Sequence, residues 1–130
     1  MAKEVHSVSE EGFQTTSTVR DFEVFVDATG EDAPDTLEML LADYASCFVP
    51  ALRVGAEQRG VDDLGRIEFD VTGDLNDDDK LDAITFDISV AADIGDKGDA
   101  ILERAFALCK VHDALKESLH ADATIEGDAF

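Results

Sequence analysis

The sequence predicts an α+β fold in which mostly antiparallel strands surround two helical regions. Two observations support this prediction. Apolar residues alternate along several short segments, and they recur at three-and-four spacing along two longer ones. The predicted order is two strands, a long helix, two strands, a second helical region and a closing strand. A chain of 130 residues suits one domain with a real core, so a single domain over residues 1–130 is expected.

The first two strands are predicted over residues 4–13 and 18–28. The second of them is rich in β-branched and aromatic side chains, which favour strands. A loop over residues 28–35 follows, marked by Gly30 and Pro34. The prediction therefore starts with two strands and a turn-rich connection into the helix.

A second pair of strands is predicted in the middle of the chain. The segments "RIEFDVTGDL" and "LDAITFDISVAAD" alternate apolar and polar residues, and the intervening "NDDDK" is expected to form a hairpin tip. This tip differs from a calcium loop because Asp79 stands where glycine is needed and Thr85 where a bidentate Glu is needed. A last strand is predicted at Ala123–Glu126.

The long central helix is predicted to start at Asp35 or Thr36 and to end at Gly60. Pro50 lies inside it and is expected to kink it or fray a turn beside Cys47. Apolar side chains cover a wide arc of this helix, and such a helix is usually buried on more than one side, so a homodimer is expected. The stripe consists of Leu37, Leu40, Leu41, Tyr44, Phe48 and Leu52.

The second helical region is predicted within "GDKGDAILERAFALCKVHDALKESL", with Asp96 or Asp99 as its N-cap. Its apolar stripe is expected to end on Cys109. The stripe consists of Ile101, Leu102, Ala105, Phe106 and Cys109.

The charge of the chain is strongly negative. There are 31 Asp and Glu against 10 Lys and Arg, which gives a formal net charge of −21. Such a surface repels nucleic acid and anionic lipid, so neither is an expected partner. The carboxylates are spread along the chain instead of forming a tail, which favours adaptation to a salt-rich cytoplasm. The sequence shows no secretory leader pattern and no apolar run of about 18 residues, so a cytoplasmic protein without a membrane span is expected.

Two cysteines are the candidate reactive groups. Cys47 lies seven residues after Leu40 and Cys109 seven after Leu102, so both are expected on apolar helix faces. Two interpretations remain open. Free cysteines are often inert core residues, whereas a cytosolic pair is also typical of redox chemistry when a cation stabilises one thiolate. Arg20 is a candidate cation, being one of only five arginines in the chain.

A metal site is a weaker hypothesis. The segment "CKVH" places Cys109 and His112 three residues apart, which suits two ligands on a helix. Completing the set would require Cys47 together with His6 or His120. No second short-spaced pair exists, so His112 is expected instead to interact with helix-end carbonyls, and no metal or cofactor is predicted.

The segment "PDTLEMLLADYASCFVPALRVGAEQRGV" resembles the central helix of the OsmC/Ohr family, and "LERAFALCKVHDALKESLHADATI" resembles its second cysteine helix and closing strand. The intervening hairpin also fits the family layout. The resemblance implies an OsmC-like α+β fold in which antiparallel sheets surround two helical regions and two chains intertwine as a dimer. This chain has Leu37 where better-known members have Glu, and Lys110 where the family often has Pro.

The resemblance also implies an activity, a thiol-dependent peroxidase acting on organic hydroperoxides and restored by an external dithiol. In that scheme Cys47 resembles the attacking cysteine and Cys109 the resolving one. Arg20 would hold the thiolate, and Glu38 would orient Arg20. The alternative is a non-catalytic dimeric domain that binds an apolar small molecule, with both cysteines as core packing.

Overall fold

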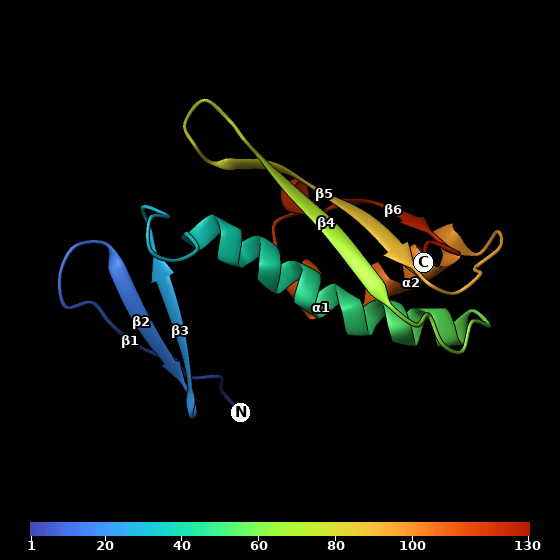
Figure 1. Ribbon diagram of the computed structural model, residues 1–130, viewed down its shortest axis with the longest axis horizontal. Helices are drawn as coiled ribbons and strands as arrows, with labels where there is room; N and C mark the ends of the chain where they lie inside the picture. The colour runs from blue at the N-terminus through green and yellow to red at the C-terminus, as the bar shows by residue number, and fades with distance from the viewer. The chain divides into compact units, whose positions relative to one another are not determined.

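The computed structural model describes all residues from Met1 to Phe130, which form two compact units, Met1–Leu40 and Leu41–Phe130. The element order confirms the predicted α+β class with a long central helix (Figure 1). In chain order the elements are β1 (His6–Val8), β2 (Gln14–Val19), β3 (Phe22–Asp27), α1 (Thr36–Gln58), β4 (Ile67–Leu75), β5 (Leu81–Val90), α2 (Gly98–Leu108), α3 (Lys110–Ala114), the 3₁₀ turn η1 (Glu117–Leu119) and β6 (Asp122–Glu126).

The first unit contains an antiparallel sheet in the order β1-β2-β3. The prediction of two strands over residues 4–13 and 18–28 is therefore wrong, because β2 was missed. Its segment, "QTTSTV", is β-branched but polar, so it carries no alternation of apolar and polar residues. Val19 pairs with Phe22, and Arg20 in the two-residue turn between them has φ 55°, the positive value that such hairpin turns require.

Helix α1 begins with a reciprocal capping box. The Asp35 carboxylate accepts the Glu38 N–H at 2.8 Å, and the Glu38 carboxylate accepts the Asp35 N–H at 2.9 Å. The helix continues through Pro50, and it ends as predicted before Gly60, which has φ 89°. The Val61 N–H then bonds the Ala56 carbonyl at 2.9 Å, which closes the last turn.

The second unit is a sheet in the order β4-β5-β6 with helices on one face (Figure 1). Strands β4 and β5 form the predicted antiparallel hairpin, whereas β6 runs parallel to β5. Phe48 of α1 is fully buried and packs its ring against Phe69 of β4, Phe86 of β5 and Phe106 of α2, at centroid distances of 6.0, 5.2 and 4.7 Å. This aromatic cluster joins the sheet to both helices.

Helices α1 and α2 approach each other closely at Gly55. A Cβ atom placed there would lie 3.3 Å from both the Ala105 nitrogen and the Ile101 carbonyl oxygen. The absence of a side chain therefore allows the two backbones to meet, which fixes α2 against the half of α1 that follows Cys47.

The second helical region is broken where the sequence predicted continuity. Helix α2 ends at Leu108, Cys109 is extended with φ −76° and ψ 113°, and α3 begins at Lys110. The expected helical position of Cys109 is therefore wrong, although its burial is confirmed at 1% exposure. The predicted N-cap is also wrong, because Lys97 occupies that position without a side-chain bond.

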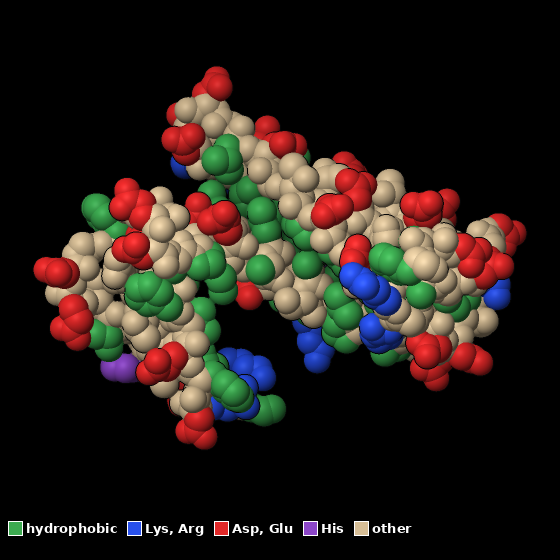
Figure 2. Space-filling model, in the orientation of Figure 1, with side chains coloured by type: hydrophobic (Ala, Val, Ile, Leu, Met, Phe, Trp, Pro, Cys, Tyr) green, Lys and Arg blue, Asp and Glu red, His purple; other side chains and the backbone are tan.

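By length and composition alone, α1 could cross a membrane, although no such run was expected from the sequence. A core helix of a folded domain passes the same test, and Tyr44, Phe48 and Leu52 of α1 are all fully buried. Figure 2 shows acidic side chains scattered over both units on the face drawn, with few basic ones among them. This distribution agrees with carboxylates spread along the whole sequence.

Candidate functional site

The second unit brings Cys47 and Cys109 together although they lie far apart in the sequence. Cys47 is half-buried in the middle of α1, and Cys109 is buried at the junction of α2 and α3. The two thiols lie close enough for each to shift the pKa of the other. Both cysteines are free thiols in this structure.

The surroundings of Cys47 stabilise its thiolate. Burial alone would raise the pKa of Cys47, but four other interactions outweigh it, so the pKa lies below the ordinary thiol value. The largest of the four is a hydrogen bond from the Val111 N–H, followed by the Cys109 thiol, the Lys110 N–H and the positive charge of the Lys110 side chain. Lys110 thus supplies a backbone donor that a proline at that position would lack.

Cys109 has the opposite character. Burial, opposed by the His112 N–H at 3.4 Å and reinforced by the neighbouring Cys47, raises the pKa of Cys109 to about 11. The raised pKa favours the protonated thiol at Cys109. The environment therefore favours the nucleophilic thiolate at Cys47 and a neighbouring protonated thiol at Cys109, which is suited to thiol–disulfide chemistry with it.

A tyrosine and two histidines lie beside the cysteines. Tyr44 is fully buried, and its hydroxyl lies 2.5 Å from Nδ1 of His112. The His112 ring stacks near His120 at a centroid distance of 3.7 Å and near Phe106 at 4.7 Å. A nitrogen of the His120 ring, Nε2, lies 3.1 Å from the Leu115 carbonyl oxygen. These contacts fix the ring of His112 on both sides.

The hydrogen-bond directions in this cluster follow from its backbone donor. The Ala121 N–H donates to the fully buried Tyr44 hydroxyl at 3.1 Å, and Nδ1 of His112 is the other partner of that hydroxyl, so the Tyr44 O–H donates to His112 and Nδ1 accepts. This arrangement requires neutral His112 with its proton on Nε2. Burial, together with the charge of His120 and against that of Asp113, holds the pKa of His112 below its usual value.

Sequence reasoning missed the role of His112. It predicted an interaction with helix-end carbonyls, whereas the ring bonds the hydroxyl of Tyr44, 68 residues away. The spacing within "CKVH" drew attention to the residue, but no local pattern identifies its partner. Tyr44 was predicted only as part of the apolar stripe.

Arg20 and Glu38 both belong to the first unit, whereas the two cysteines belong to the second. The Arg20 guanidinium lies over the Phe22 ring at 5.1 Å from its centroid. The Glu38 carboxylate caps the start of α1 through the Asp35 N–H. Their predicted roles at the Cys47 sulfur stay predictions.

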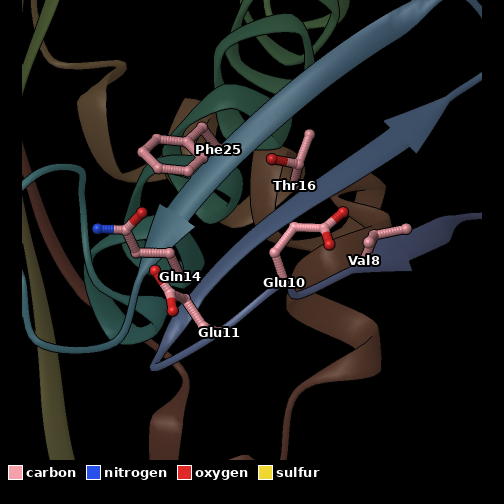
Figure 3. A pocket seen from close by; sticks show the side chains of 6 residues that line it. All are labelled: Val8, Glu10, Glu11, Gln14, Thr16 and Phe25. Atoms are coloured by element: carbon pink, nitrogen blue, oxygen red, sulfur yellow. The ribbon is translucent and has the colours of Figure 1, made fainter.

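The structure offers no cluster of metal ligands, and the apolar-ligand alternative stays a prediction for the dimer. No group of three or more His, Cys, Asp or Glu side chains is placed to hold a metal ion. A pocket of about 430 Å³ opens on the sheet of the first unit (Figure 3). Its mixed lining, with two carboxylates, does not suit a wholly apolar ligand. The lining residues are Val8, Glu10, Glu11, Gln14, Thr16 and Phe25.

Comparison with known proteins identifies the family. A family model described as OsmC-like protein matches residues 28–123, so the chain belongs to the OsmC-like family. A protein of the halophilic archaeon Haloferax volcanii is 50% identical over 125 residues, which is 95% of each chain. These matches confirm the resemblance found in the sequence.

Solved structures confirm the fold at low sequence identity. One of them is a Psychrobacter arcticus protein described as an osmotic stress induced and detoxification response protein. It has a TM-score of 0.81 at 16% identity, over 97% of this chain and 96% of its own. The organic hydroperoxide resistance protein OhrB of Bacillus subtilis has a TM-score of 0.72 at 18% identity, over 97% and 98%. An OsmC-like protein of Mycoplasma pneumoniae has a TM-score of 0.77 at 17% identity, over 98% and 96%.

Proposed function

We propose that the protein is a dithiol peroxidase that reduces organic hydroperoxides. The observation that carries the proposal is the neighbouring cysteine pair, in which the half-buried Cys47 has a lowered pKa and the buried Cys109 has a pKa of about 11. Two cysteines that served only as core packing would not require different pKa values. Membership of the OsmC-like family and similarity to hydroperoxide resistance proteins support a peroxide-related redox role.

The chemistry proceeds in three steps. The Cys47 thiolate attacks one peroxide oxygen, the O–O bond breaks, and the products are a Cys47 sulfenic acid and an alkoxide that takes a proton to become an alcohol. The Cys109 sulfur then attacks the Cys47 sulfur, the S–O bond breaks, and water leaves with the Cys109 proton. An external dithiol reduces the resulting disulfide and is itself oxidised, which restores both thiols.

Cations near the Cys47 sulfur belong to the same proposal. Lys110 contributes its N–H and its charge, both of which lower the pKa of Cys47. Arg20 is proposed as a second cation for the thiolate and the peroxide, oriented by Glu38, as the family resemblance implies. Arg20→Lys keeps the charge but loses the planar fork, so it separates a geometric role from simple charge.

The catalytic experiment uses steady-state consumption of cumene hydroperoxide in molar KCl with dithiothreitol as reductant. Cys47→Ser is expected to abolish consumption. Cys109→Ser is expected to retain sulfenic acid formation at Cys47, which dimedone traps, while no intramolecular disulfide forms. If Cys47→Ser consumes peroxide as fast as the parent protein, the proposal is wrong. Fully inert thiols in the folded parent would favour the binding-domain alternative instead.

Apolar side chains exposed on both faces of the first unit's sheet support the proposed homodimer. Its sheet region leaves five large apolar side chains exposed, and Phe13 and Phe22 are 71% and 60% exposed. A soluble protein usually covers such a surface with a partner. The expected measurement is a mass of two chains by light scattering, with Phe22→Glu shifting the protein toward one chain. The exposed set is Val5, Val8, Phe13, Phe22 and Phe25.

A salt-rich cytoplasm is proposed as the working environment. The net charge of −21 and the relative from a halophilic archaeon support this habitat. Screening by salt reduces the repulsion between carboxylates, so it favours the compact state of such a chain.

A further inference from the structure

The hydrogen bond between Tyr44 and His112 connects the two segments that carry the cysteines. Tyr44 lies three residues before Cys47 on α1, so the two side chains share a helix face. His112 lies three residues after Cys109, and its N–H bonds the Cys109 sulfur at 3.4 Å. One side-chain bond of 2.5 Å therefore spans the junction about one turn from both sulfurs.

Both partners of this hydrogen bond are held in place independently of it. The Tyr44 ring packs edge-on against Phe86 at a centroid distance of 4.6 Å, and its hydroxyl accepts the Ala121 N–H. The His112 ring lies between Phe106 and His120. A bond between two fixed groups restrains the short segment that carries one of them, which here is α3.

The position of α3 matters because its first residues serve the Cys47 sulfur. The N–H groups of Lys110 and Val111 both lower the pKa of Cys47, and Cys109 immediately precedes them. Helix α3 is only five residues long, so its own hydrogen bonds hold it weakly. An anchor at His112 therefore restrains the donors and the resolving thiol together.

We propose that Tyr44 and His112 are positioning residues for the dithiol pair, which hold the start of α3 against Cys47 as long as His112 is neutral. This inference rests on the proposed peroxidase function. Neither side chain is proposed to contact the substrate. Each acts through the geometry of the Cys47 and Cys109 sulfurs.

Protonation of His112 would weaken the anchor. A protonated Nδ1 can no longer accept the Tyr44 O–H; it can only donate to the Tyr44 oxygen, which also accepts the Ala121 N–H, and the buried hydroxyl proton is then left without an acceptor. The charged or titratable groups that face the ring are Tyr44 from α1, Asp113 and Cys109 from α3 and its cap, and His120 from the segment before β6. Asp113 favours the protonated ring and His120 opposes it.

The first test measures the Cys47 thiolate without any peroxide. In a Cys109→Ser background, iodoacetamide alkylates the only cysteine, and the rate against pH gives the titration midpoint of Cys47. His112→Leu and Tyr44→Phe are each expected to move this midpoint upward. His112→Asn keeps an oxygen acceptor near the position of Nδ1 and is expected to keep the midpoint of the parent background.

The second test measures disulfide formation in a single turnover with cumene hydroperoxide, in chains that retain both cysteines. His112→Leu and Tyr44→Phe are expected to slow this step by about tenfold or more, because misplaced reacting groups lose rate steeply. The parent rate is expected to fall at acid pH through the titration of His112. In His112→Asn the rate of disulfide formation is expected to stay close to the parent rate at neutral pH and not to decrease at acid pH.

The outcomes separate this inference from the peroxidase proposal. If His112→Leu and Tyr44→Phe fold and keep both the parent midpoint and the parent rate, the inference is overturned. If His112→Leu does not fold, His112→Asn decides, because an unchanged acid fall in that variant also overturns it. Failure of Cys109→Ser to form a Cys47 sulfenic acid defeats the peroxidase proposal, whereas the alkylation midpoint stays measurable.

Discussion

Replacement of Tyr44 by Phe removes one hydroxyl from the buried junction between α1 and α3. The change keeps the aromatic ring and its edge-on contact with Phe86. It removes the acceptor of the Ala121 N–H and the donor to His112. The variant therefore isolates the polar contribution of the residue.

The expected loss of stability follows from the two groups that lose their hydrogen-bond partner, the Ala121 N–H and Nδ1 of His112. Ala121 is 8% exposed, so its N–H is left buried without an acceptor, which costs about 1–3 kcal/mol. His112 is half-buried, and its freed nitrogen can bind water, so that loss adds only about 0.5–1 kcal/mol. Together they predict a decrease of about 1.5–4 kcal/mol in the free energy of unfolding, or a melting temperature lower by roughly 10 °C.

The assay is urea unfolding of the reduced protein in molar KCl at a fixed chain concentration, since a dimer makes stability depend on concentration. Ser46→Ala is the matched control, because it removes an exposed hydroxyl from the same helix whose bond goes to the Ala42 carbonyl. The control is expected to change stability by less than about 0.5 kcal/mol. A Tyr44→Phe protein as stable as Ser46→Ala would refute the hydrogen-bond directions assigned here.

Three further predictions concern charge, pH and packing. The free energy of unfolding should rise steeply with KCl concentration because the net charge is −21, and full stability in dilute buffer would contradict this. Because the folded-state pKa of His112 is lowered, neutral His112 contributes stability that is present above its ordinary pKa of about 6.5 and lost as pH falls through the lowered value. Parent stability should therefore fall more between about pH 7 and pH 5 than that of His112→Asn, and equal slopes in urea titrations would contradict this. Gly55→Val should destabilise the protein by about 1–3 kcal/mol in the same assay, because its side chain meets the backbone of α2, and an unchanged unfolding midpoint would contradict the close approach.

The sequence was sufficient where burial leaves a periodic signal. The apolar stripe predicted α1 to within two residues of its observed end, and strict alternation predicted the β4–β5 hairpin. The strand β2 could not be predicted in this way, because its Thr and Ser side chains form no apolar face. Local propensity alone did not decide between a strand and a loop.

The candidate site was predictable in part. Cys47 and Cys109 were singled out from composition and family resemblance, but the chain is broken at Cys109, where no Gly or Pro marks the break. The anchor between Tyr44 and His112 spans 68 residues and arises only when the sheet, helices and η1 are packed together. The division of pKa values between the sulfurs likewise depends on N–H groups freed by that break.

The most direct test of the account is the mass of the peptide that links the two cysteines after one equivalent of cumene hydroperoxide. The reduced protein is treated in molar KCl, alkylated, digested and analysed without reductant. A Cys47–Cys109 disulfide is expected in the parent, and in Cys109→Ser a Cys47 sulfenic acid is expected in its place. Recovery of both cysteines as alkylated thiols, with the peroxide unconsumed, would contradict it.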